Sequence, residues 1–203
     1  MKTLWYIGRD LSEPITYLPY GAVFATVIML VVLAGGVSEN HSAGSALRKR
    51  EAAAFALCWL FLVYMSVVLI QTIFSRELGS RNTIDLRLFG TLGHSPRSRS
   101  YFVENIIMMV PFGIFLPLLN RKFKKAAVTV LCGCLFSIMI EVLQFLTESG
   151  FCQLDDVLTN TLGTAIGFII YRICVWIIEY SGAAEPPFRK FGNRESGTGN
   201  RHT

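Results

Sequence analysis

Long apolar stretches separated by shorter polar connections dominate this chain. A helix needs roughly 17 to 25 mostly apolar residues to cross a hydrocarbon core of about 30 Å. Stretches of this kind lie at residues 19–37, 52–74, 126–147 and 156–179, and a shorter one lies at 104–119. The pattern therefore predicts an all-α integral membrane bundle of about five transmembrane helices.

The stretch at residues 104–119 differs from the others because it is short and interrupted. Glu104 and Asn105 stand at its start, and Pro111 and Pro117 lie within it. Proline removes a backbone donor and kinks or breaks a helix, which membranes tolerate in bent or re-entrant segments. We expect a short third helix that is tilted, kinked or re-entrant.

The composition agrees with a membrane protein. Of the 203 residues, 52% are hydrophobic and only 16% are charged, whereas about a quarter are charged in soluble domains. Five helices leave no room for a separate soluble domain, so we predict one transmembrane domain at residues 1–181. Residues 182–203 are rich in Gly, Pro and charge, which predicts a disordered tail. The first apolar run is long for a signal peptide, which favours a retained anchor.

Lys and Arg are distributed unevenly between the two faces that this bundle would have. One face would carry residues 48–50, residues 121–125 and the tail, and it holds more Lys and Arg than the other. Cytoplasmic connections are enriched in these residues, so we predict an outside N-terminus and a cytoplasmic C-terminus. The net charge of +5 then suits an anionic lipid leaflet, and nucleic-acid binding is not indicated.

The apolar stretch at residues 126–147 contains an ionisable residue, Glu141. Such a residue is costly in hydrocarbon and usually has a function. Helical spacing places Ser137, Glu141, Gln144 and Glu148 on one face. We therefore expect a wet or partner-facing stripe along the outer half of this helix.

The apolar stretch at residues 156–179 has a comparable polar face. Asp156 and Asn160 stand at its outer end, and a Gly-x-x-x-Gly pair, Gly163 and Gly167, lies deeper. Small residues let helix backbones approach closely. We predict that the last three helices surround one outward-facing pocket, with Arg81, Arg97 or Arg99 as counter-ion, and that the pocket is lined by Asn105, Glu141, Gln144, Asp156 and Asn160.

Structural explanations exist for several of these residues. The amides of Asn105, Gln144 and Asn160 can join helices by hydrogen bonds. Asp155 fits a helix cap, because acids are favoured at a helix N-terminus. Pro111 fits a role in shaping the third helix, and both glycines of the pair fit close packing. No disulfide framework, metal site or cofactor is predicted, since the cysteines lie mostly in apolar stretches and no histidine lies near them.

Three motifs taken together resemble the VanZ-like membrane proteins, a family named for a teicoplanin-resistance protein. They are NIIMMVPFGIFLPLL from Asn105, SIMIEVLQ from Ser137 and FCQLDDVLTNTLGTAIG from Phe151. The chain departs from the family pattern after Arg81, where NTIDLRLFGTL contains no proline. The resemblance places the characteristic positions at Asn105, Pro111, Gly113, Glu141, Gln144, Asp155, Asp156, Asn160, Gly163 and Gly167.

The resemblance implies a bacterial plasma-membrane protein linked to teicoplanin-type antibiotic resistance. We expect a non-enzymatic pocket that binds an envelope lipid, a lipid-linked cell-wall precursor or a lipoglycopeptide. Two alternatives stay open. One is an enzyme acting on a lipid headgroup, with Glu141 and Asp156 as acid and base, although no serine nucleophile, metal-ligand spacing or phosphate loop indicates it. The other is a proton-coupled transporter with Glu141 as proton carrier. The sequence does not fix an oligomeric state.

Overall fold

The computed structural model describes residues 2–35, 45–74, 81–85 and 95–181. The predicted disordered tail lies outside the described residues. The elements, in chain order, are helices α1 (Lys2–Asp10), α2 (Glu13–Gly35) and α3 (Ser45–Leu69), a π-helical turn (Ile70–Phe74), strand β1 (Arg81–Asp85), helix α4 (Pro96–Leu119), a 3₁₀ turn (Arg121–Lys124), helix α5 (Ala126–Leu146), strand β2 (Ser149–Gln153) and helix α6 (Leu154–Tyr180).

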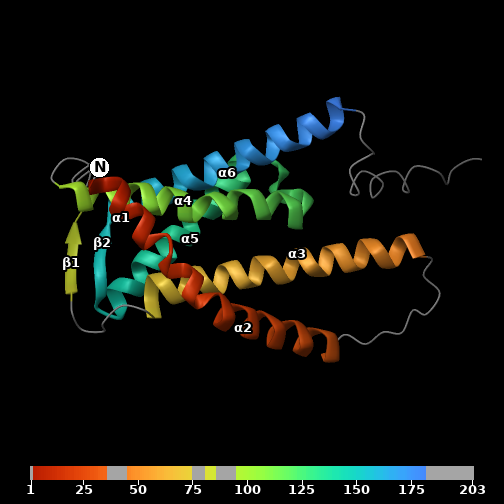
Figure 1. Ribbon diagram of the computed structural model, residues 1–203, viewed down its shortest axis with the longest axis horizontal. Helices are drawn as coiled ribbons and strands as arrows, with labels where there is room; N and C mark the ends of the chain where they lie inside the picture. Colours follow the sequence, from red (N-terminus) through yellow and green to blue (C-terminus); the bar gives the residue numbers. More distant parts are fainter. Residues whose placement is uncertain (1, 36–44, 75–80, 86–94, 182–203) are drawn as a thin grey trace, which may run out of the picture.

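The long helices α2 to α6 lie roughly along one direction and form an elongated bundle (Figure 1). The described residues contain 5 helical segments long and apolar enough to cross a membrane, the first of them including α1. The predicted all-α bundle of five spans is therefore confirmed. In Figure 1, α1 and both strands lie at one end of the bundle, and the end of α2, the start of α3 and the end of α6 lie at the other.

The third spanning helix is not short, so this part of the prediction is wrong. Helix α4 has 24 residues and begins at Pro96, well before residue 104. The side chain of Ser95 caps its start by accepting a hydrogen bond from the backbone N–H of Ser98 at 3.1 Å. Pro96 suits the first turn, where a missing N–H costs no helical hydrogen bond. The hydropathy pattern missed these polar first turns, although α4 continues as one helix through Pro111 and Pro117.

Glycines hold α4 and α6 close together. A Cβ atom on Gly163 would overlap the carbonyl oxygen of Ile106, and one on Gly167 would overlap that of Val110. On the facing helix, a Cβ on Gly113 would overlap the carbonyl oxygen of Thr164. The two backbones are therefore in direct contact, which is how small residues allow helix association in lipid.

A cluster of apolar side chains packs α4 against α3 and α5. Met109, Phe112 and Leu116 of α4 are buried at its centre. The ring of Phe112 stacks on Phe136 of α5 with centroids 5.1 Å apart. The hydroxyl of Tyr64 on α3 donates a hydrogen bond to the carbonyl oxygen of Met108 at 2.9 Å, so the contact between α3 and α4 has a polar component as well.

The connections at the end of the bundle near α1 contain a small sheet that the sequence did not lead us to expect. Strands β1 and β2 pair in parallel, with Arg81 opposite Ser149 and Asp85 opposite Gln153. The pairing satisfies the backbone polar groups along one edge of each strand. The pairing brings the connection between α3 and α4 alongside the connection between α5 and α6.

Replacement of Gly167 by Ala tests the importance of the α4–α6 contact. The added Cβ forces the two backbones apart, and overpacking of this kind costs about 1 to 3 kcal/mol. We expect the Gly167→Ala protein, purified in detergent, to melt at a lower temperature by circular dichroism. Gly8→Ala in α1 is the control, because nothing lies within 4 Å of a Cβ at that position. Equal melting of Gly167→Ala and wild type would contradict the inferred packing.

Candidate functional site

Glu141 joins α5 to the start of α6. Its side chain is buried, with 3% of the residue exposed. The Oε2 atom accepts a hydrogen bond from the backbone N–H of Gln153 at 2.9 Å. Gln153 is the N-cap residue of α6, and its own side chain forms no capping hydrogen bond. Glu141 therefore places a carboxylate where the unpaired N–H groups and the dipole of a helix start favour negative charge.

Two more carboxyl groups lie in the first turn of α6. Asp155 is buried with 3% exposure, and Asp156 is half-buried. The hydroxyl of Thr159 donates to the backbone carbonyl of Asp155 at 2.9 Å. Acidic side chains in a first helical turn are stabilised by the dipole. Together with Glu141 they place three carboxyl groups near the start of α6.

The amide of Asn160 connects α6 to α5 one turn further in. Its Nδ2 atom donates a hydrogen bond to the hydroxyl of Ser137 at 2.8 Å, and both side chains are buried. Its Oδ1 atom is also buried and has no donor among the described residues. The hydroxyl of Thr164 donates to the backbone carbonyl of Asn160, not to the side-chain oxygen. Asn160 therefore holds two helices together and keeps one acceptor unused.

Gln144 performs a similar role between α5 and the π-helical turn after α3. Its Nε2 atom donates to the backbone carbonyl of Thr72 at 2.9 Å. Its Oε1 atom is buried and meets no donor within the described part of the chain. π-helical turns occur frequently at functional sites. The sequence analysis missed Thr72, although the polar pair Gln71–Thr72 interrupts an otherwise apolar run.

The remaining predicted residues lie in different surroundings. Asn105 is half-buried on α4, beside Ile106, whose carbonyl meets Gly163 of α6. Its neighbour Glu104, which we did not predict as a site residue, has a buried Oε1 atom with no hydrogen-bond donor from the described ranges. The carboxyl group of Glu104 lies near Asp10 of α1 and Arg97 of α4.

The three candidate counter-ions also differ from one another. Arg97 forms an ion pair with Asp10 of α1 at 3.0 Å and lies over the Tyr6 ring, 5.0 Å from its centroid. It therefore holds α1 against α4, contrary to the expected role in the pocket. Arg99 is exposed. The backbone of Arg81 lies in β1, opposite Ser149 of β2, and its side chain lies outside the described residues.

Glu141, Gln144 and Asn160 thus form one buried polar layer near the C-terminal end of α5 and the N-terminal end of α6. The layer presents carboxylate and amide oxygens, which can accept hydrogen bonds from hydroxyl, amide or ammonium groups. In the part of the chain that the structure describes, no three His, Cys, Asp or Glu side chains gather in a way that would hold a metal ion.

Comparison with known proteins assigns the chain to a family. Residues 52–175, more than half of the chain, match the VanZ/LLP1 family model. The chain belongs to the VanZ/LLP1 family. It is similar to Protein VanZ of Enterococcus faecium, with 36% identity over 78 residues, which is 35% of this chain and 44% of that protein. No solved structure gives a significant match to the chain.

The region that matches the family model contains Glu141, Gln144 and Asn160 of the polar layer. It begins in α3, ends in α6 and includes both strands. The three sequence motifs that suggested VanZ-like membership all lie inside it, so the predicted membership is confirmed. Helices α1 and α2 precede the matched residues.

A double-mutant cycle on Ser137 and Asn160 tests the bond between α5 and α6. Ser137→Ala and Asn160→Ala each remove one partner, and hydrogen bonds of this kind in membranes contribute about 0.6 to 2 kcal/mol. We expect a coupling free energy in that range when unfolding in mixed micelles is measured for both single variants and the double variant. Strictly additive losses would show that the two side chains do not interact.

Proposed function

We propose that the polar layer around Glu141, Gln144 and Asn160 faces the outside of a plasma membrane and binds a polar headgroup there. The proposed ligand is an envelope lipid, a lipid-linked cell-wall precursor or a lipoglycopeptide. The consequence is reduced action of teicoplanin-type antibiotics. Membership of the VanZ/LLP1 family supports the link to the cell envelope.

The observation that carries this proposal is the pair of unused acceptors, Gln144 Oε1 and Asn160 Oδ1. Both atoms are buried, and neither has a donor among the described residues. Leaving a buried acceptor without a donor costs about 1 to 3 kcal/mol. Sugar hydroxyls and peptide N–H groups supply the missing donors, and a sugar or peptide headgroup carries several of them.

Access to these atoms requires a conformational change. Glu141, Gln144 and Asn160 are each no more than 3% exposed. A ligand therefore selects a state in which the outer helix ends are further apart, and its affinity is reduced by the cost of that opening. The hydrogen bond from Gln153 to Glu141 is the contact that such an opening would break.

Two measurements separate binding from the alternatives. The Oε2 atom of Glu141 accepts the Gln153 backbone N–H at 2.9 Å, which gives this carboxyl group a structural role at the start of α6. Chemical turnover of a lipid by the purified protein would support the enzyme alternative, and pH-dependent flux across liposomes would support the transporter.

Teicoplanin susceptibility tests the proposed function. A sensitive bacterium expresses wild type, Glu141→Gln or Asp156→Asn, with membrane levels matched by immunoblot. We expect wild type to protect, both variants to lose most of the protection, and vancomycin susceptibility to change less, because vancomycin lacks a lipid chain. Glu51→Gln is the matched control, because Glu51 is exposed and lies in the second turn of α3, whose start is at the other end of the bundle. No protection by abundant wild type would reject the antibiotic role.

Reporter fusions test the proposed orientation. The exposed basic connection between α4 and α5 and the C-terminal end of α6 lie at the same end of the bundle. Because basic connections favour the cytoplasm, we expect a green fluorescent protein fused to the C-terminus to fluoresce. Alkaline phosphatase fused at the same position should be inactive. Active phosphatase with a dark fluorescent fusion would invert the orientation and place the polar layer at the cytoplasmic face.

A further inference from the structure

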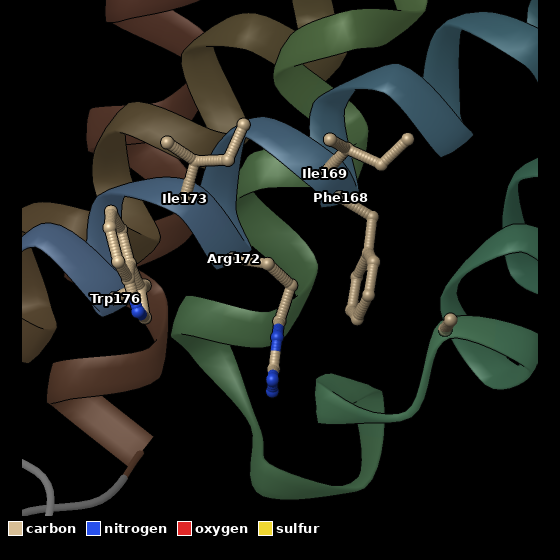
Figure 2. Close-up of a pocket in the computed structure, with 6 residues that line it drawn as sticks. Phe168, Ile169, Arg172, Ile173 and Trp176 are labelled. Atoms are coloured by element: carbon tan, nitrogen blue, oxygen red, sulfur yellow. The ribbon is translucent and has the colours of Figure 1, made fainter.

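A groove lies at the end of the bundle opposite the polar layer. It has a volume of about 440 Å³ and is lined by Ala126 at the start of α5 and, on α6, by Phe168, Ile169, Arg172, Ile173 and Trp176. Figure 2 shows Phe168 and Arg172 extending from the same side of α6, while Ile169 and Ile173 point to another side. The groove is therefore apolar except for one guanidinium group.

The level of this groove in the membrane follows from helix lengths. Helix α5 has 21 residues, which corresponds to about 31 Å, close to the hydrocarbon thickness of about 30 Å. Ala126, its first residue, therefore marks one edge of the hydrocarbon layer. Arg172 lines the same groove as Ala126 and lies near that edge. Trp176, one turn further along α6, is an aromatic residue of the kind that favours the headgroup level.

Arg172 is the charged residue that lines the groove, and the next acid along α6 is Glu179, seven residues further on. Arg172 is exposed, and no carboxylate of the described residues forms an ion pair with it. None of the lining residues is acidic. Residues 121–125, just before Ala126, add exposed Lys and Arg side chains and no acid. An exposed guanidinium on a lipid-facing surface is costly unless it reaches an anion at the interface.

We propose that this groove binds one anionic phospholipid, of the phosphatidylglycerol or cardiolipin class, from the leaflet at the basic end of the bundle. Arg172 holds the lipid phosphate, and the basic residues 121–125 neutralise the net charge of the headgroup. An acyl chain lies along Phe168, towards the membrane centre. The indole of Trp176 lies at the level of the glycerol and phosphate.

Charge complementarity selects this occupant. A zwitterionic lipid also carries a phosphate, but its ammonium group would lie among Arg172 and residues 121–125 and be repelled. A net negative headgroup is attracted by about 1 kcal/mol for each Lys or Arg near the surface, and these outnumber the nearby acid of α6, Glu179. Planar guanidinium groups bind phosphate through two parallel hydrogen bonds, so Arg172 gives the site geometric definition.

Tryptophan quenching by brominated lipids tests the site. Trp176 is made the only tryptophan by Trp5→Phe and Trp59→Phe, and the protein is placed in vesicles of phosphatidylcholine containing brominated phosphatidylglycerol or brominated phosphatidylcholine. We expect the anionic lipid to quench Trp176 with at least a fivefold higher relative binding constant. Arg172→Gln should reduce this preference about fivefold, the equivalent of roughly 1 kcal/mol. Arg172→Lys should retain part of it.

Three outcomes would overturn the proposal. Equal quenching of the wild-type site by both lipids would show only ordinary boundary lipid. An unchanged preference in Arg172→Gln, with helicity and melting equal to the parent, would remove Arg172 from the site. A preference that does not fall as salt increases would exclude an electrostatic origin. Arg99→Gln, an exposed arginine of α4 near the other end of the bundle, is the matched control and should leave the preference unchanged.

Discussion

The direct contact between the backbones of α4 and α6 is the constraint on which the rest of the structure depends. Apolar side chains gain little from leaving lipid, so helix association in a membrane depends on close packing and polar contacts. Gly113, Gly163 and Gly167 provide that packing, because each lies where a side chain would collide with the opposite backbone. The contact fixes the start of α6, and Glu141 of α5 then meets the N-terminal turn of α6 through the Gln153 N–H.

At the end of the bundle that holds the two strands, polar groups of one element are satisfied by partners on another. β1 and β2 pair with each other, Glu141 accepts the N–H at the start of α6, and Gln144 donates to a carbonyl of the π-helical turn. Each contact joins elements that are distant in the chain, so polar groups that would be costly alone become the connections between helices. The arrangement also concentrates carboxyl groups and unused amide oxygens in one small region.

The features that the sequence predicted well are local. Hydropathy located the five spans, and helical spacing placed Ser137, Glu141 and Gln144 on one stripe, all of which are buried. Glu148, predicted on the same stripe, lies beyond the end of α5 and is exposed, so this part of the prediction is wrong. The features that it missed depend on partners elsewhere in the chain. The pairing of β1 with β2 has no strong strand signal, and Arg97 meets Asp10 because α1 folds against α4. The start of α4 depends on a capping serine, which a search for apolar runs does not detect.

The two unused acceptors argue that the polar layer does more than hold helices together. Asn160 and Gln144 each already make one interhelical hydrogen bond through the amide nitrogen. A hydroxyl side chain could make an interhelical hydrogen bond of the same kind. Well-packed apolar side chains of similar volume are often no less stable than buried polar groups. Yet both oxygens remain buried without a described donor, which costs about 1 to 3 kcal/mol for each. The ligand that we propose would supply the missing donors and so favour the open state that admits it.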